Sequence, residues 1–108
     1  MAAVKPALQK KIMREQFPEA IADLNLLLKA DSLNPDYLFL RAECYMHQKQ
    51  ADKALADFDK AVRVKPNQPL LLMERGVAKM QAKQFPAALA DFDQALRFDP
   101  KLEPLRLY

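Results

Sequence analysis

The chain has 108 residues, of which 51% are hydrophobic and 29% are charged, and its formal net charge is +3 at pH 7. This length and composition predict one soluble globular domain and argue against intrinsic disorder. The small basic excess indicates no nucleic-acid partner, and no run of about 18 apolar residues is present to cross a membrane. A single cysteine, Cys44, excludes an internal disulfide and fits the reducing cytoplasm, where we expect the protein.

A 34-residue period organises the chain. Residues 54–59 read Ala-Leu-Ala-Asp-Phe-Asp, and the same string recurs at residues 88–93. When blocks are drawn as 1–34, 35–68 and 69–102, the second and third blocks agree at 15 of 34 places. Because composition alone would give far fewer matches, the sequence predicts three repeats, of which the first is the most degenerate.

Prolines and apolar spacing predict two helices in each block. Pro35 and Pro69 open the second and third blocks, and Pro18 and Pro86 fall where a second helix should begin. Proline is tolerated there because the N–H that it lacks would be unpaired in a first helical turn. The apolar residues between these prolines recur with a period near 3.6, which is typical of helices and not of strands. In chain order we expect helices over residues 3–14, 18–30, 35–48, 52–64, 69–82 and 86–98.

The second helices carry the most specific motif. An alanine, a phenylalanine four residues later, a second alanine and a closing proline recur with the same spacing in two blocks, as Ala54, Phe58, Ala61 and Pro66, and as Ala88, Phe92, Ala95 and Pro100. With the 34-residue period, this motif resembles the tetratricopeptide repeat family. The resemblance implies an all-α, right-handed superhelical α-solenoid of three helix-turn-helix repeats, forming a single domain over residues 1–108.

The first block departs from the family pattern. Ala42 and Gly76 stand where the two helices of a block cross closely, and Gly76 indicates a steric requirement because a helical glycine costs about 1 kcal/mol relative to alanine. The first block has the bulky Leu8 at this place, and Leu24 replaces the phenylalanine of the motif. We therefore expect the first repeat to pack less regularly.

The resemblance implies that the first helices line a concave surface that holds a peptide of another protein. Beside their core-facing residues these helices carry a second stripe, which includes the four methionines beyond the initiator. Flexible thioethers suit a surface that must adapt to a partner, and exposed apolar patches mark interaction sites. We predict a groove for an apolar or amphipathic peptide with some basic character; alternatively, stacking between repeats buries much of the stripe. The predicted groove residues are Met13, Asp36, Phe39, Leu40, Glu43, Met46, His47, Leu70, Met73, Glu74, Val77 and Met80.

Some family members bind a C-terminal carboxylate with lysine, arginine and asparagine side chains on the groove helices. At the equivalent places this chain has Lys5 and Gln9, followed by Leu40, Leu70 and Glu74. That set cannot form the clamp. Although the groove is co-chaperone-like in outline, we do not predict binding to the acidic tails of cytosolic chaperones.

Catalytic and metal chemistry find little support. Glu43, Cys44 and His47 lie within about one helical turn, but a structural zinc site needs about four ligands and no second cluster supplies the rest. Cys44 aligns with Ala78, so a small core residue is its expected role. A single glycine in the chain excludes a glycine-rich phosphate loop. We expect no enzyme activity, no metal and no cofactor.

Two further patterns, one of aromatic and one of acidic residues, indicate no additional function. RNA-binding repeats need basic and stacking residues at one place in each unit, whereas Phe39 is replaced by Met73 in the next block. The carboxylates two residues apart on the second helices point in different directions. We expect these carboxylates, Asp57, Asp59, Asp91 and Asp93, to face solvent on the convex surface or to pair with Lys60, Lys53 or Arg97.

The end of the chain offers an alternative function. Residues 103–108 read as the start of a truncated capping helix, and arrays that lack a polar cap expose their stacking surface. The alternative to a peptide-binding module is therefore a structural scaffold that forms a homodimer through its C-terminal repeat, or that places this tail in a neighbouring groove.

Overall fold

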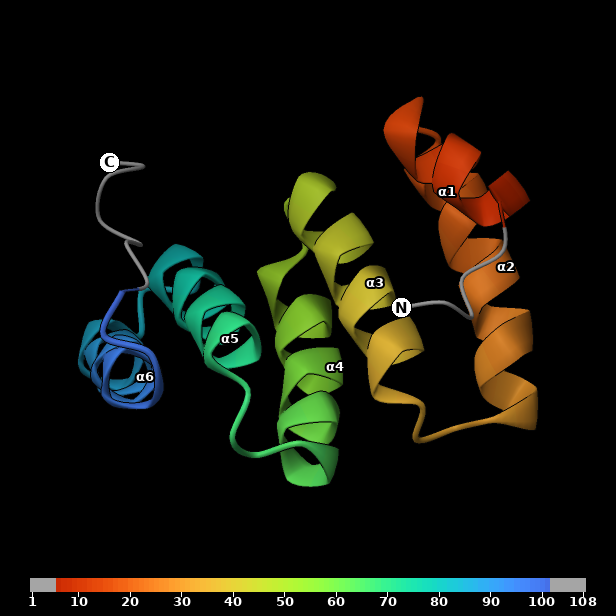
Figure 1. Ribbon diagram of the computed structural model, residues 1–108. Coiled ribbons are helices and arrows are strands. Elements are labelled where there is room, and N and C mark those ends of the chain that lie inside the picture. The colour runs from red at the N-terminus through yellow and green to blue at the C-terminus, as the bar shows by residue number, and fades with distance from the viewer. Residues whose placement is uncertain (1–5, 102–108) are drawn as a thin grey trace.

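The computed structural model describes residues 6–101, which form six α-helices in three antiparallel hairpins (Figure 1). The helices are α1 (Pro6–Met13), α2 (Phe17–Ala30), α3 (Pro35–His47), α4 (Ala51–Val64), α5 (Pro69–Gln81) and α6 (Phe85–Phe98). Within this range no residue is in a strand. Because α2 packs on α3 and α4 packs on α5, the hairpins stack side by side in chain order as an all-α repeat solenoid.

The helix boundaries confirm the sequence-based expectation. Each end lies within one residue of its predicted place, except the start of the first helix, where residues 3–5 lie outside the described range. Helices α2, α3, α5 and α6 each have proline in the first turn. The side chain of Asn34 also accepts hydrogen bonds from the backbone N–H groups of Asp36 and Tyr37, at 2.9 and 3.2 Å, and so caps α3.

The turn inside each hairpin contains a residue in the left-handed region. Glu15, Lys49 and Lys83 have φ angles of 60°, 59° and 64° and stand 34 residues apart. The residue that follows each of them donates its N–H to the carbonyl five residues back, at 2.8, 2.9 and 2.8 Å. This 6→1 hydrogen bond is typical of the Schellman motif, which usually places glycine at the left-handed residue. The turn is therefore set by its hydrogen bonds, at some conformational cost in each repeat.

The close helix crossings follow a rule of matched volumes. A Cβ atom added to Gly76 would lie 2.6 Å from Cε1 of Phe92, so the phenylalanine ring occupies the space of the missing side chain. In the second hairpin the corresponding residues are the buried Ala42 and Phe58. In the first hairpin Leu8 and Leu24 share one buried cluster. The bulky Leu8 is thus accommodated because Leu24 is smaller than the phenylalanine of the other hairpins.

Buried arginine–aspartate pairs join the helices of the second and third hairpins. Arg41 on α3 donates from Nε and Nη2 to the two carboxylate oxygens of Asp57 on α4, both at 2.7 Å. Its third nitrogen, Nη1, donates to Oδ1 of Asn25 on α2 at 2.8 Å. One guanidinium therefore connects its own hairpin to the preceding hairpin.

The third hairpin repeats this arrangement. Arg75 on α5 donates from Nε and Nη2 to Asp91 on α6, both at 2.8 Å, and from Nη1 to Asp59 on α4 at 3.1 Å. Lys79 adds an ion pair to Asp91 at 3.0 Å. The hydrogen bonds to the aspartates raise the pKa of both arginines further above its usual value. Both guanidiniums therefore keep their positive charge beside the buried aspartates.

This arrangement corrects the predicted role of three carboxylates. Asp57 and Asp91 are buried between helices, and they do not solvate the outer surface. Asp57, Asp59 and Asp91 pair with arginines of the first helices, not with the lysines or the arginine that lie near them in sequence. Lys53 lies instead over the ring of Tyr45, at 5.7 Å from its centroid. The prediction was wrong because it considered only neighbours within one helix, whereas the partners are 16 residues away on the facing helices.

Candidate functional site

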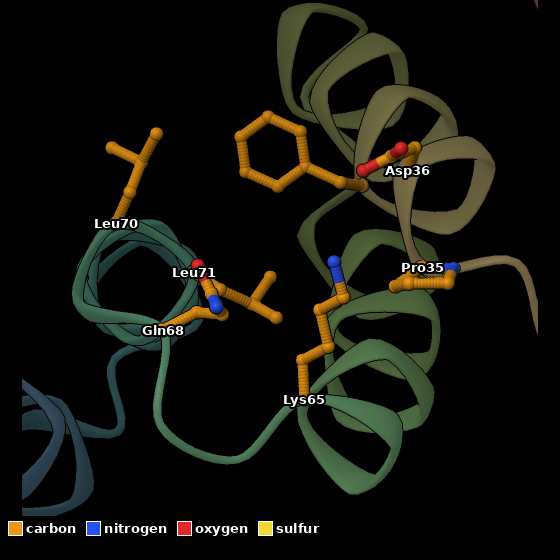
Figure 2. A pocket seen from close by; sticks show the side chains of 7 residues that line it. Pro35, Asp36, Lys65, Gln68, Leu70 and Leu71 are labelled. Atoms are coloured by element: carbon orange, nitrogen blue, oxygen red, sulfur yellow. The ribbon is translucent and has the colours of Figure 1, made fainter. Parts of the chain in front are cut away.

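A pocket opens between the N-terminal halves of α3 and α5 (Figure 2). Its volume is about 220 Å³, and it is lined by Pro35, Asp36, Phe39, Lys65, Gln68, Leu70 and Leu71. Figure 2 shows Leu70 and Asp36 on opposite sides of the pocket, with Leu71 and Lys65 between them. The lining is mostly apolar, with one carboxylate and one ammonium at its edges. We name this the α3/α5 pocket.

Two of the apolar residues in this pocket are fixed by the core beneath it. Leu71 is buried and belongs to the core cluster that contains Phe58, and Phe39 packs against the same cluster. The rings of Phe39 and Phe58 meet edge to face, with centroids 6.0 Å apart. Leu70, in contrast, is 55% exposed. The pocket therefore combines a rigid apolar floor with an accessible leucine at its rim.

A second pocket of about 220 Å³ lies further along the same two helices. Its lining residues are Glu43, Met46, His47, Glu74, Val77 and Gln81. Two glutamates, one from each helix, therefore face one space between adjacent repeats. We name this the glutamate pocket.

The electrostatics of the glutamate pocket favour protonation of its carboxyl groups. Burial, and to a lesser degree the nearby charge of Glu74, raises the pKa of Glu43 to about 7. Burial also raises the pKa of Glu74, against the opposing effect of His47. Within residues 6–101 neither glutamate forms an ion pair. Two half-buried carboxyl groups therefore share this pocket with the imidazole of His47.

Stacking between hairpins removes part of the predicted stripe from solvent. Met73 is only 7% exposed and packs with Phe92 in the core of the third hairpin, where Val77 also packs. Met46 packs against the central cluster, and Leu40 packs against the cluster of the first hairpin. These four residues are thus largely covered by neighbouring helices.

The ends of the stripe remain accessible. Met13, at the end of α1, and Met80, near the end of α5, are both exposed. His47 is exposed, but its ring stacks on Phe17 of α2 with centroids 4.5 Å apart and an interplanar angle of 4°. The stripe is thus an apolar floor with accessible side chains at its edges, and the structure brings its α3 and α5 members together along one seam.

Several lining residues were not among the predicted ones. Lys65 and Gln68 belong to the connection between α4 and α5, and Leu71 is a core residue whose edge reaches the α3/α5 pocket. Reasoning from helical stripes omits connections, so it could not select the first two. The signal that would have found them is the Pro66–Pro69 segment, whose short length keeps it against the start of α5.

The cysteine is placed for packing. Cys44 is fully buried, and burial, followed by the charge of Glu43, raises the pKa of its thiol to about 11. A thiol that stays protonated is a poor nucleophile and a poor metal ligand. In the described part of the chain, no three His, Cys, Asp or Glu side chains gather as a metal site would require.

Comparisons with known proteins agree with this architecture. Two sequence profiles described as tetratricopeptide repeat match residues 42–107 and residues 14–69. The chain belongs to the tetratricopeptide repeat family. A comparison with curated proteins found no match. Over residues 6–101 this tetratricopeptide repeat protein has no helix long and apolar enough to span a bilayer.

Solved structures share the fold at low sequence identity. The first TPR of Spaghetti (RPAP3), solved bound to the HSP90 peptide SRMEEVD, is 23% identical with a TM-score of 0.89, over 95% of this chain and 82% of that one. The first TPR domain of human RPAP3 is also 23% identical, with a TM-score of 0.86 over 94% and 80% of the two chains. The Sgt2 TPR domain from Aspergillus fumigatus is 21% identical, with a TM-score of 0.82 over 97% and 76%. At these identities the likeness shows the fold.

Proposed function

We propose that residues 1–108 act as one protein-interaction domain whose groove, lined by α1, α3 and α5, binds an apolar or amphipathic peptide segment of another protein. The observation that carries this proposal is the α3/α5 pocket, an open apolar space beside Leu70, which is 55% exposed. Ligand sites are typically concave, mostly apolar and equipped with a few polar groups at their edges, as this pocket is.

Membership of the family supports a peptide ligand, and one structural neighbour binds an acidic peptide of HSP90. The proposed groove of this chain lacks the basic side chains that would bind an acidic peptide. Leu40, Leu70 and Glu74 stand where a carboxylate clamp would need basic or amide side chains. Glu74 would repel an acidic tail, so the proposed ligand differs from that of the neighbour.

A peptide selection with matched variants tests the proposal. The purified chain would be panned against a phage library of random 12-residue peptides, and affinities of enriched peptides would be measured by fluorescence anisotropy. Leu70→Asp places a charge at the rim of the α3/α5 pocket and should weaken binding at least tenfold. Leu26→Asp, at a leucine that is 67% exposed on α2, is the matched control and should leave binding unchanged.

Two results would contradict the groove. One is a selection that enriches no peptide, and the other is binding that Leu26→Asp weakens and Leu70→Asp leaves intact. Both leucines are exposed, so neither substitution removes core packing, and circular dichroism would verify that both variants remain folded.

The outer side of the third hairpin favours a second candidate function, which is self-assembly. Phe85 and Leu89, one turn apart on α6, are both exposed large apolar residues. A second copy packed against them would cover apolar surface that a monomer leaves in water. Sedimentation at several concentrations tests this candidate: association that Leu89→Asp abolishes supports it, and a monomer at all concentrations contradicts it.

A further inference from the structure

We infer that the peptide bound by this groove is basic, with an apolar side chain in the α3/α5 pocket and a lysine or arginine about three residues away that lies between Glu43 and Glu74. This inference rests on the proposed function and deepens it by naming the chemistry of the ligand. It assigns a polarity opposite to that of the acidic HSP90 peptide held by the structural neighbour.

The charges along the seam between α3 and α5 favour a basic ligand. Three cations project from these helices, but each is engaged by carboxylates of the second helices. Arg41 is bound by Asp57, Arg75 by Asp91 and Asp59, and Lys79 by Asp91. These pairs leave three carboxyl groups along the seam, Asp36, Glu43 and Glu74, against the ammonium of Lys65 at one edge and the imidazole of His47. Potentials across specific interfaces are complementary, so such a seam selects a cationic partner.

The two glutamates then define where the cation lies. They come from adjacent repeats and line one pocket, so a single ammonium or guanidinium placed there meets both. Burial, and to a lesser degree the charge of Glu74, raises the pKa of Glu43 to about 7, so a negative charge at Glu43 is disfavoured. A bound cation would favour the charged form of Glu43. The attraction between the two charges is also stronger where water is excluded.

The remaining lining suits a long basic side chain. Met46 and Val77 contribute apolar surface next to the two carboxylates. Lysine and arginine pack their methylene stems on apolar surface while the charged group reaches a polar site. A hard metal ion such as Mg²⁺ or Ca²⁺ would gain nothing from those two residues, whereas a basic side chain uses both features of the pocket.

The spacing of the two pockets sets the register of the peptide. Asp36 in the first pocket and Glu43 in the second are seven residues apart on α3. At a rise of about 1.5 Å per residue, this separation is about 10 Å along the helix. An extended polyproline-II-like segment advances about 3.1 Å per residue and returns to the same side after three residues. An apolar residue and a basic residue three apart therefore fit the two pockets together.

A positional library tests this register directly. Phage-displayed peptides with a fixed central leucine and five randomised residues on each side would be panned against the intact chain. We expect lysine and arginine to be enriched three residues from the leucine, on one side. The strongest binder, remade with norleucine in place of that lysine or with citrulline in place of that arginine, should bind at least fivefold more weakly, because this removes the charge and keeps the methylene stem.

Protein variants complete the test. Glu43→Gln with Glu74→Gln should reduce the preference for the charged peptide over its neutral analogue to less than twofold. Asp93→Asn, at an exposed carboxylate on α6, is the matched control and should preserve the preference.

The outcomes separate this inference from the proposed function. If peptides bind and Leu70→Asp weakens them, but no basic residue is enriched or the double glutamine variant keeps the full preference, the basic register is wrong and the groove stands. If no peptide is enriched, or if binding ignores Leu70→Asp, the groove itself is wrong.

Discussion

The first hairpin and the two that follow it are held together by different chemistry. In the second and third hairpins an arginine makes two hydrogen bonds to a buried aspartate, as Arg41 does to Asp57, which is 2% exposed. In the first hairpin Ala7 replaces that arginine, and Lys11 pairs with Asp23 at 2.6 Å through side chains that are 35% and 36% exposed. The same helix geometry is therefore obtained with a buried ion pair in two hairpins and with a solvated pair in one.

This difference predicts where single substitutions will most reduce the stability of the fold. Removing one member of a buried pair leaves an uncompensated charge in the interior, whereas an exposed pair loses little because water replaces the partner. The guanidiniums also reach Asn25 and Asp59 on the preceding hairpin, so their loss weakens the stacking between repeats. Sensitivity to mutation should therefore rise from the first hairpin to the second and third.

The largest expected effect comes from breaking one buried pair. Arg41→Ala leaves Asp57 buried without its two donors and should lower the free energy of unfolding by about 3–5 kcal/mol. Lys11→Ala, at the equivalent ion pair of the first hairpin, should cost about 1 kcal/mol or less. Urea denaturation followed by circular dichroism measures both. Equal losses in the two variants would contradict the comparison.

A double replacement keeps this test informative if Arg41→Ala does not fold. Arg41→Met combined with Asp57→Leu removes both charges and keeps the volume, so it should be less destabilising than Arg41→Ala by about 2 kcal/mol or more. A double variant as unstable as the single one would mean that the stability comes from packing of the side chains and not from pairing of the charges.

The close crossing of α5 and α6 gives the next prediction. Gly76→Ala gains about 1 kcal/mol of helix propensity but brings a Cβ atom to 2.6 Å from Phe92, and overpacking costs about 1–3 kcal/mol. We expect a net loss of about 1 kcal/mol. In a chain that already carries Phe92→Leu, Gly76→Ala should cost much less stability. The first hairpin shows why, because it pairs the larger Leu8 with Leu24. A double-mutant cycle by urea denaturation with no coupling would refute the matched-volume rule.

The glutamate pocket gives a pH-dependent prediction. The pKa of Glu43 is 4.5 in the unfolded reference and about 7 in the fold, so folding takes up a proton between these values. The stability from this uptake is full below about pH 4.5 and is lost as the pH rises through about 7. The groups that face Glu43 are Glu74 on α5 and Cys44 and His47 on its own helix.

Glu43→Gln removes this titration. Relative to the variant, the wild-type chain should lose on the order of 1 kcal/mol between pH 5 and pH 8, since the half-exposed side chain is partly screened by water. Parallel urea titrations at both pH values measure the difference. A wild-type chain that gains stability over this range relative to Glu43→Gln would contradict the assigned direction of the shift.

The left-handed turn residue is common to all three hairpins, and replacing it should have a small and similar effect in each. Glycine adopts the left-handed conformation without the cost that other residues incur, so Glu15→Gly, Lys49→Gly and Lys83→Gly should each raise stability by about 0.5 kcal/mol. Thermal unfolding by calorimetry would detect a small rise in midpoint for each. A fall in all three would mean that the charged side chains contribute more than the turn geometry suggests.

The sequence predicted the helices well because their signals are local. Prolines at Pro35 and Pro69 and the 3.6-residue apolar period determine the helix ends without knowledge of the tertiary structure. Gly76 likewise indicated a close crossing, and the structure places Phe92 against it. The partners of Asp57 and Asp91 could not be found in this way, because pairing across 16 residues depends on how two helices face each other.

The candidate site could be predicted only in outline. The stripe on α3 and α5 was located from spacing, and both pockets lie along it. Spacing did not distinguish Met73, which is buried by the third hairpin, from Leu70, which is exposed three residues earlier. That distinction depends on which of the two side chains faces α6 within the third hairpin. Lys65 lies in a connection between helices, outside any stripe.

The most direct test of the groove is a titration of the peptide selected from the library into the ¹⁵N-labelled chain, followed by amide chemical shifts. If the peptide binds in the groove, the largest amide shifts should appear on α3 and α5, at Asp36, Leu70 and Glu74. The amide shifts of Leu89 and the rest of α6 should stay unchanged. Shifts concentrated on α6, with the α3/α5 pocket unaffected, would contradict binding in the groove.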